Sequence, residues 1–290
     1  MIDPQGRTIT NLRISVTQEC NLNCPYCHRE GEYNGYGDEM SVEKIKKLVE
    51  SASKLGIKWV KITGGEPLLR QDIIKIVETI SKTPGILEVS ITTNGTLLEK
   101  LAKPLADAGL KRINIGCDSL SSSISGKTIN NILPGVIAAK NAGLYPVKLN
   151  MVVMKGINDD EIEGMMNFAK KFGCILQLIE LVPFDVEFHK NYFFSLETLE
   201  NKLEKSADKI IIRKMNSRRQ YFVGDLVVEV VRPHLNRKFC ESCEKLRVTS
   251  DGKIKPCLMR DDNLVDTNEN NEDINELFDK AVKKRELYYN

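Results

Sequence analysis

Short apolar runs alternate with helical segments over about 180 residues of this chain, and that alternation limits the possible folds more than any other feature. The runs expected to be strands are 12–16, 58–63, 87–93, 111–117, 146–154 and 174–182. The helical periodicity between them covers 41–56, 70–82, 97–110, 130–143 and 158–173. Such alternation predicts a parallel sheet with right-handed crossovers, as a barrel or a doubly wound open sheet. Because six units are fewer than the eight of a full barrel, we expect an incomplete (β/α)6 parallel barrel, open on one side.

Two prolines interrupt the helical periodicity. Pro104 and Pro134 fall inside the third and fourth helical segments. Since proline lacks the N–H that a helix interior needs, we expect these helices to start late or to kink.

The pattern changes after Pro183, which predicts a division into residues 1–183 and a smaller α+β extension, residues 184–290. The extension is expected to contain a helix, two short strands, a hairpin that turns at Asp251-Gly252, and a last helix. These elements are placed at 195–207, 219–225, 226–232, 245–258 and 273–287.

The charge balance excludes several classes of partner. Lys and Arg total 42 and Asp and Glu total 40, so a net charge of +2 indicates neither a nucleic-acid-binding nor a membrane-surface protein. The first residues do not resemble a signal peptide, and no apolar run approaches the roughly 18 residues of a membrane span. We therefore expect a cytoplasmic protein, in which the eight cysteines stay reduced and favour metal ligation over disulfides.

Six of the eight cysteines form two triplets. They are Cys20, Cys24 and Cys27, spaced CxxxCxxC after the first strand, and Cys240, Cys243 and Cys257 near the other end. A structural zinc site takes four ligands, whereas a three-thiolate 4Fe–4S cluster leaves one iron open. For the second triplet, a zinc half-site completed by His234 remains an alternative. The single residues Cys117 and Cys174 lie in apolar runs and are expected to be core residues.

The first triplet and ITGGEP (62–67), which follows the second strand, together resemble the radical S-adenosylmethionine (SAM) superfamily over roughly residues 12–182. The resemblance implies that the open iron holds the amino and carboxylate groups of SAM. It also implies that the backbone of Tyr26 meets the adenine and that the glycine-rich turn binds the amine. The SAM positions implied in this way are Tyr26, Gly64, Gly65, Glu66, Gly116 and Val182. Gly116 and Val182 stand where the family that also shares the second triplet has a serine and a methionine.

The two triplets together resemble one family almost end to end, the GTP 3',8-cyclases of molybdenum cofactor biosynthesis. LRISVTQECNLNCPYC, KITGGEPLLR, TTNG, RINIGCD, KGINDD and FCESCEKLRVTSDGKIKPCL follow that family's order. The resemblance implies two 4Fe–4S clusters, SAM, GTP as substrate, a ferredoxin or flavodoxin type electron donor and a downstream pterin-forming enzyme. Residues 1–183 would then hold the first cluster and SAM, and residues 184–290 the second cluster and substrate contacts.

The same resemblance implies a set of substrate contacts. They are Arg13, Lys61, Thr92, Lys148, Lys245 and Arg247, with Arg13, Lys148 and Arg247 as the catalytic positions. Lys61 stands where the family commonly has arginine, so it keeps the charge but lacks the bidentate fork. The sequence ends in RELYYN without the family's double glycine, so another group replaces that tail or the activity differs.

Two other functions fit parts of the pattern. A radical SAM enzyme that modifies a peptide would also carry extra C-terminal cysteines, although usually more than three. A non-enzymatic iron–sulfur electron carrier would need neither ITGGEP nor a substrate-sized barrel. GTP-dependent formation of 5'-deoxyadenosine would distinguish the three.

Overall fold

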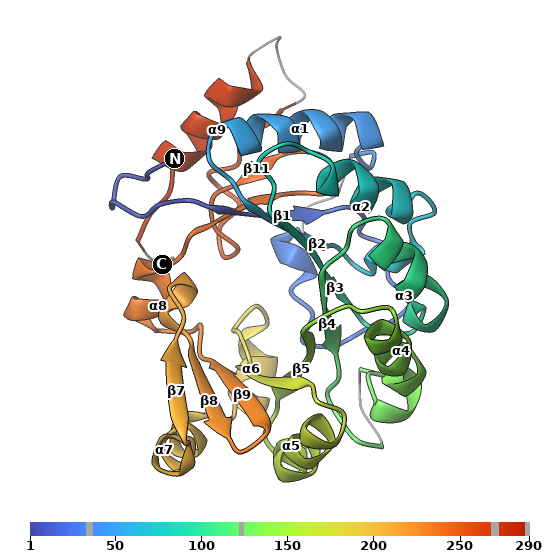
Figure 1. Ribbon diagram of the computed structural model, residues 1–290. Coiled ribbons are helices and arrows are strands. Elements are labelled where there is room, and N and C mark those ends of the chain that lie inside the picture. Colours follow the sequence, from blue (N-terminus) through green and yellow to red (C-terminus); the bar gives the residue numbers. More distant parts are fainter. Residues whose placement is uncertain (33–36, 122–124, 268–272, 288–290) are drawn as a thin grey trace.

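One curved sheet runs through the computed structural model, which describes residues 1–32, 37–121, 125–267 and 273–287. The strands of the described chain follow the order β11-β10-β1-β2-β3-β4-β5-β6-β9-β8-β7. Helices α1 to α5 lie along the outer, convex side of the sheet (Figure 1). The expected open parallel barrel is confirmed.

The bounds of the elements are as follows. The strands are β1 Asn11–Ser15, β2 Trp59–Thr63, β3 Glu88–Thr93, β4 Arg112–Gly116, β5 Val147–Val153, β6 Ile175–Glu180, β7 Lys209–Ile212, β8 Arg219–Val223, β9 Leu226–Val231, β10 Lys245–Val248 and β11 Ile254–Lys255. The helices are α1 Val42–Lys54, α2 Ile73–Ser81, α3 Leu98–Asp107, α4 Ile129–Asn141, α5 Ile162–Lys171, α6 Val186–Tyr192, α7 Glu197–Ser206, α8 Arg237–Glu241 and α9 Ile274–Lys283. Within the described ranges, none of them is long and apolar enough to span a bilayer.

The hydrophobic core fills the space between the sheet and the outer helices. Alternate strand residues such as Leu12, Ile14 and Ile62 are buried there, because successive side chains of a strand point to opposite faces. Helix α1 buries Ile45 and Leu48 against them and leaves its charged residues in solvent. The other face of each strand is thereby left free to line the inside of the barrel.

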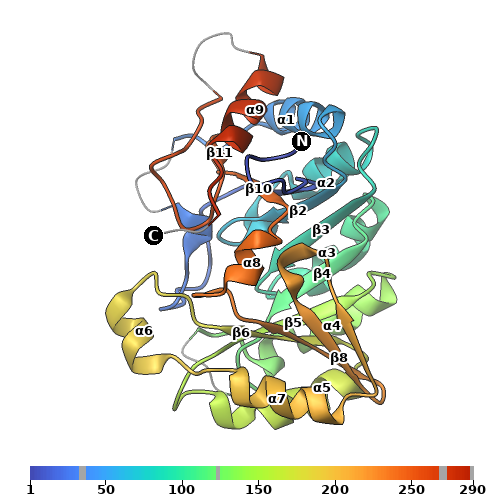
Figure 2. The ribbon, with the colours of Figure 1, turned by 90° about the vertical axis from the view of Figure 1, so that its left-hand side faces the viewer.

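The C-terminal part extends the same sheet at both of its edges. Strand β10 pairs in parallel with β1, and β9 pairs in parallel with β6. Strands β8 and β7 continue outward as antiparallel neighbours, and β11 forms the expected hairpin with β10. Figure 2 shows α8 in front of the sheet, between the two edges of the open barrel. Cys240 on α8 and Cys243 precede β10, so the second triplet begins at the end of the paired strands β1 and β10 opposite to the first triplet.

Both proline-containing helices are continuous elements. Helix α3 begins at Leu98 and passes through Pro104, and α4 begins at Ile129 and passes through Pro134. The expected late start is wrong. Each helix buries apolar residues on both sides of its proline, and this packing compensates for the missing hydrogen bond.

Candidate active site

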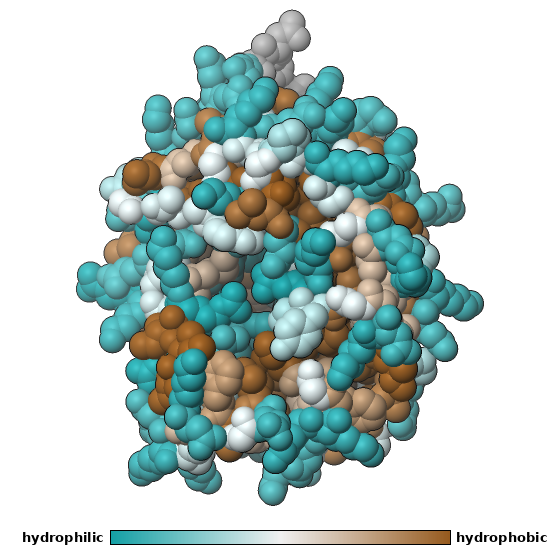
Figure 3. Space-filling model, in the orientation of Figure 1, coloured by the Kyte–Doolittle hydropathy of each residue, from teal (hydrophilic) through white to brown (hydrophobic). Residues whose placement is uncertain are grey.

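Polar and cationic side chains line the inside of the barrel. Because residues paired across parallel strands share a face, Arg13 lies in one row with its register partners Lys61 and Arg247. A second row contains the partners Asn114 and Lys148. Figure 3 shows hydrophilic side chains gathered around a hollow in the middle of the molecular surface that it draws. The fold therefore brings most of the predicted substrate contacts together.

Glu30, in the turn Arg29–Gly31 after the first triplet, joins two of these cations. It accepts hydrogen bonds from Arg247 Nη1 at 2.7 Å, Arg13 Nη1 at 3.3 Å and Thr63 Oγ1 at 2.9 Å. Its backbone has φ 53°, a left-handed conformation that turns the carboxylate into the barrel. Burial raises the pKa of Glu30, but Arg13 and Arg247 hold that pKa well below its usual value. The carboxylate stays ionised and fixes both guanidinium groups.

Glu229, on β9, gathers three further cations. Its carboxylate oxygens lie 2.5 Å from Lys148 Nζ, 2.7 Å from Arg218 Nη1 and 3.4 Å from Arg213 Nη1. Burial raises the pKa of Glu229, yet Arg218, Lys148 and Arg213 lower it to about 2. Burial also lowers the pKa of Lys148 to about 8, against the attraction of Glu229. Three cations share one carboxylate, so this cluster keeps a net positive charge.

Lys61 and Lys245 lie among these cations, and their surroundings disfavour the charged form of each. Burial inside the barrel lowers the pKa of Lys61 well below its ordinary value, and Arg13 and Arg112 lower it further. The pKa of Lys245 is also lowered by burial, and Arg218 is among the neighbouring cations that contribute. Cations crowded in this way favour a polyanionic ligand, which relieves their repulsion.

Several buried polar side-chain atoms find no hydrogen-bond partner in the described ranges, and three of them belong to one part of the sheet. These three are Thr92 Oγ1, Asn114 Oδ1 and Asn150 Oδ1, on three adjacent strands. Buried polar groups are normally hydrogen-bonded, so this row is suited to a polar ligand inside the barrel. The residues present therefore fit a bound nucleotide.

The first triplet occupies the loop that follows β1. Cys20 and Cys27 are exposed and Cys24 is partly buried. The amide of Cys27 donates to the carbonyl of Cys24 at 3.1 Å, which folds the loop back on itself. Burial raises the pKa of the Cys20 and Cys24 thiols, and the nearby Cys27 thiol adds to both shifts. The three thiols are neighbours, although among the described side chains no closed set of three metal ligands is preformed.

The glycine-rich turn packs against the start of that loop. A Cβ at Gly64 would lie 2.4 Å from the carbonyl oxygen of Thr17, and one at Gly65 would lie 2.3 Å from that of Glu19. Only glycine permits this approach. The amides of Gly65 and Glu66 donate to these same two carbonyls, at 2.8 and 2.7 Å. The amides of Gly65 and Glu66 are thereby engaged within the protein, which leaves carbonyl oxygens as the backbone groups of the turn suited to an amine.

Glu66 connects the glycine-rich turn to the turn that follows β3. It is fully buried and accepts hydrogen bonds from Thr93 Oγ1 and the amide of Asn94, each at 2.6 Å, and from the amide of Leu68 at 2.9 Å. These bonds join the turn after β2 to the turn after β3. The structure thus surrounds this predicted SAM residue with protein groups.

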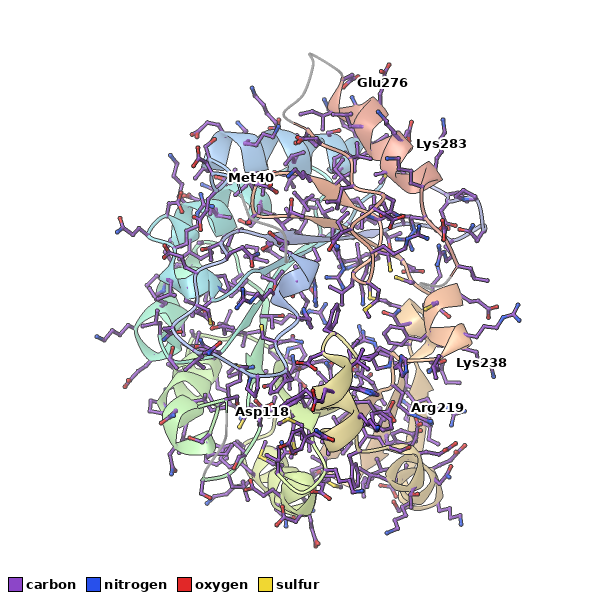
Figure 4. All side chains as sticks on the ribbon, turned by 180° about the vertical axis from the view of Figure 1, so that it is seen from behind. Met40, Asp118, Arg219, Lys238, Glu276 and Lys283 are labelled. Atoms are coloured by element: carbon purple, nitrogen blue, oxygen red, sulfur yellow. The ribbon has the colours of Figure 1, made fainter. Side chains whose placement is uncertain are left out.

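Tyr26 belongs to a polar cluster beside the first triplet. Its hydroxyl donates to Asp118 Oδ2 and accepts from Lys127 Nζ at 3.0 Å, and Ser125 Oγ donates to the same aspartate oxygen at 2.6 Å. Figure 4 shows Asp118 on the side of the barrel away from Lys238 of α8. Gly116 ends β4 next to this cluster, whereas Val182 follows β6 and is partly buried.

The second triplet lies where α8 and the β10–β11 hairpin meet. Burial raises the pKa of Cys240 to about 11, with the Cys243 and Cys257 thiols contributing. Burial also raises the pKa of Cys243, but Arg285 and Lys245 lower it to about 7, which favours the thiolate.

His234, the alternative fourth ligand for the second triplet, packs edge-on against the ring of His189 at 5.4 Å. His189 belongs to α6, so this contact ties His234 to the segment after β6. It gives no support to a zinc site formed by His234 and the second triplet.

Several cluster residues were missed by sequence reasoning. They are Glu30, Arg112, Lys127, Arg213, Arg218 and Glu229. Arg112 alternates with the buried Ile113 in a predicted strand, and that signal could have found it. Arg218 also lines a cavity of about 380 Å³ between α7, β8, β9 and α8, which nothing in the sequence pattern indicates.

The sequence matches two protein families and a group of named relatives. Residues 14–169 match the radical SAM superfamily, and residues 174–290 match the family described as Molybdenum Cofactor Synthesis C. A probable GTP 3',8-cyclase of Methanosarcina acetivorans is 45% identical and covers 100% of this chain and 90% of its own length. Those of Methanothermobacter marburgensis and Pyrococcus horikoshii are 46% and 47% identical, covering 99% and 100% of this chain and 98% of their own lengths.

Solved structures share the fold at low identity. Streptococcus suis SuiB bound to S-adenosylmethionine has a TM-score of 0.67 at 16% identity, covering 86% of this chain and 60% of its own. The anSMEcpe structure with bound AdoMet has a TM-score of 0.64 at 17% identity, covering 96% of this chain and 81% of its own. From the sequence relatives and the shared fold, the chain belongs to the radical SAM superfamily and, within it, to the family of proteins named GTP 3',8-cyclase.

Proposed function

We propose that this chain is a lyase that cyclises GTP to (8S)-3',8-cyclo-7,8-dihydroguanosine 5'-triphosphate, the first step of molybdenum cofactor biosynthesis. The observation that carries the proposal is the cationic inner face of the barrel, which lies between two three-cysteine loops. Neither a two-cluster radical SAM enzyme that modifies a peptide nor an electron carrier needs such a face for a triphosphate. The names of the relatives agree with this substrate.

The cation clusters divide the substrate-binding task. Arg13 and Arg247, oriented by Glu30, bind phosphate oxygens with a fork of donors, and Lys148 beside Glu229 supplies a further charge. Lys61, Thr92 and Lys245 complete the predicted contacts. Fixed donors of this kind hold the ribose 3' carbon and guanine carbon 8 in place for the bond between them.

The SAM side is formed by the loop after β1 and the turns after β2 and β4. Cys20, Cys24 and Cys27 would ligate the first cluster, and the carbonyls of the Gly64-Gly65 turn would accept from the SAM amine. When bound, this cluster with SAM supplies the hydrogen-abstracting radical. Glu66 holds the turn in place, and Tyr26, Gly116 and Val182 line the remaining positions.

The second triplet would hold a second 4Fe–4S cluster, which makes two in all. Its ligands would be Cys240, Cys243 and Cys257, and its open iron would anchor the purine. Residues 1–183 then act as the SAM-cleaving unit and residues 184–290 as the substrate-anchoring unit. The eight free thiols suit a reducing, cytoplasmic setting with a low-potential ferredoxin or flavodoxin as donor and a pterin-forming enzyme downstream.

The test is anaerobic incubation of the reconstituted protein with reductant, SAM and GTP. We expect 5'-deoxyadenosine to form in proportion to a cyclised nucleotide of the same mass as GTP. Formation that ignores GTP but responds to a peptide would favour a peptide-modifying enzyme. Bound iron without any SAM cleavage would favour an electron carrier.

A further inference from the structure

Lys127 lies at the centre of the predicted SAM site, yet neither the motifs nor the family resemblance assigns it a role. It belongs to the segment between β4 and α4. Its Nζ donates to Tyr26 Oη at 3.0 Å, lies 4.0 Å from Asp118 Oδ2 and stands 5.1 Å from the centre of the Tyr26 ring. Its side chain is 19% exposed, so the ammonium is held inside the site.

The absent side chain of Gly116 makes room for this lysine. A Cβ at Gly116 would lie 3.0 Å from Lys127 Cδ, 3.3 Å from Cε and 3.5 Å from Nζ. The first distance is tighter than most real contacts of a Cβ atom, so a side chain at this position would crowd the lysine. The amide of Asp118 also donates to the carbonyl of Lys127 at 2.8 Å, which anchors the lysine backbone beside the end of β4.

The ammonium acts on the residues expected around SAM. Lys127 Nζ contacts Tyr26 of the cluster loop. Burial raises the pKa of the Glu66 carboxyl, and the charge of Lys127 lowers it. Lys127 is therefore within reach of the cluster loop and of the turn expected to take the SAM amine. The one anionic group of SAM is its carboxylate, and a buried ammonium ion attracts that group and repels the sulfonium and the amine.

We propose that Lys127, packed against Gly116 and Tyr26, is a SAM-positioning residue whose ammonium binds the carboxylate of SAM. The inference rests on the proposed SAM chemistry of the first triplet. It adds a charged contact to those expected from the open iron and the glycine-rich turn.

The test measures SAM binding and leaves turnover aside. Lys127→Met keeps the length of the side chain and removes its charge, whereas Lys127→Arg keeps the charge. On the anaerobic holoenzyme we expect Lys127→Met to weaken SAM binding by about tenfold or more in calorimetry, and Lys127→Arg to retain most of the affinity. Lys111→Met, an exposed lysine at the start of β4, is the matched control and should bind like the wild type.

A ligand without the carboxylate separates this contact from a general effect on the site. 5'-Methylthioadenosine keeps the adenine, ribose and sulfur of SAM but has no amino acid group. We expect Lys127→Met to change its affinity by less than about twofold. The electron paramagnetic resonance spectrum of the reduced first cluster should also need more SAM to change in this variant than in the wild type.

Three results would overturn the proposal. One is unchanged SAM affinity in Lys127→Met. Another is an equal loss for SAM and for methylthioadenosine, which would mean that Lys127 acts through Tyr26 on the adenine side. The third is SAM affinity in Lys127→Arg as low as in Lys127→Met.

Iron content and thermal melts check that each variant is loaded and folded. If Lys127→Met loses iron, Lys127→Gln takes its place, because glutamine retains a donor for the Tyr26 hydroxyl. SAM binding is measured without GTP. A protein that binds SAM through Lys127 but ignores GTP would contradict the proposed function alone.

Discussion

The two cysteine triplets lie at opposite ends of the paired strands β1 and β10, because the first follows β1 and the second begins before β10, and their surroundings differ. The first is on a loop, with Cys20 and Cys27 exposed, and the charges beside it are the Asp118 and Lys127 of one mutually balanced cluster. The second is tied into the sheet through β10, and Arg285 holds the carbonyl of Cys243 at 2.7 Å. One site is open toward a ligand, and the other is part of the framework.

The difference follows from what each site has to hold. An open loop can accept a cluster and a cosubstrate that is consumed and replaced at each turnover. If the second triplet holds the proposed second cluster, its bracing would keep that cluster in a fixed position relative to the cations of the inner face, as a substrate anchor requires. We expect changes at the first triplet to affect SAM chemistry and changes at the second to affect stability and GTP.

The largest expected effect comes from deleting one ligand of each triplet. Cys24→Ala should abolish 5'-deoxyadenosine formation while the protein keeps the second cluster, because a thiolate of the SAM-binding cluster is lost. Cys243→Ala should keep SAM binding while GTP binding and turnover collapse. Iron content measures how many clusters each variant keeps, calorimetry measures SAM binding, and product analysis measures turnover. Normal SAM cleavage by Cys24→Ala, or zinc at the second site, would show that the two triplets do not have these separate functions.

The next effect concerns the bracing of the second triplet. Arg285 is 3% exposed, and it donates to Asp3 Oδ2 at 2.9 Å and to the carbonyls of Cys243, Lys245 and Pro256. Arg285→Ala should lower the free energy of unfolding by about 3–5 kcal/mol, because it removes one of the two arginine partners of Asp3 and leaves several buried carbonyls without their donor.

Chemical unfolding and iron content provide the measurements for Arg285→Ala. Lys283→Ala, on the exposed side of α9 (Figure 4), is the control and should change stability by less than about 0.5 kcal/mol. If Arg285→Ala were as stable as the control, the second triplet would be no better braced than the first.

The sequence was sufficient to predict the barrel but not its outer edge. The six parallel strands carry strong apolar runs, and their order follows from the rule of right-handed crossovers. Strand β7 was missed because its residues, Lys209–Ile212, are all exposed on an edge and show no alternation. Helix α8 has only five residues, too few for a periodic signal.

For the site, the sequence supplied the motif residues but not the groups that orient them. Glu30 meets Arg247 across 217 positions, and only a turn with positive φ aims it there. Lys127 meets Tyr26 across 101 positions, and Arg285 meets Cys243 across 42. Such partners depend on how loops from different strands pack, which no local pattern encodes.

A smaller effect is expected at the cations that we propose to bind phosphate. Arg247→Ala removes a charge-assisted donor and leaves Glu30 with Arg13 alone, so GTP binding should weaken by at least about tenfold, equivalent to 1.5–3 kcal/mol. Arg247→Lys should lie between this variant and the wild type because lysine lacks the fork. SAM affinity should hardly change in either. Equal affinity of the wild type for guanosine and GTP would show that the cations do not bind phosphate.

The smallest effect is a pH dependence that Lys148 gives to GTP binding. Burial lowers the pKa of Lys148 to about 8, so the ammonium is present below that pH and is lost as the pH rises through it. If GTP requires the charged form, affinity should fall by up to about fourfold between pH 7 and 8.5. Lys148→Arg stays charged throughout and should flatten this part of the profile. GTP affinity is measured by calorimetry for both holoenzymes over that pH range. Lys61 and Lys245, whose pKa values are also lowered, and GTP itself titrate alike in both proteins, so their contributions cancel when the two profiles are compared. Parallel profiles for the two proteins would show that the Lys148 ammonium is satisfied by Glu229 and takes no part in holding the nucleotide.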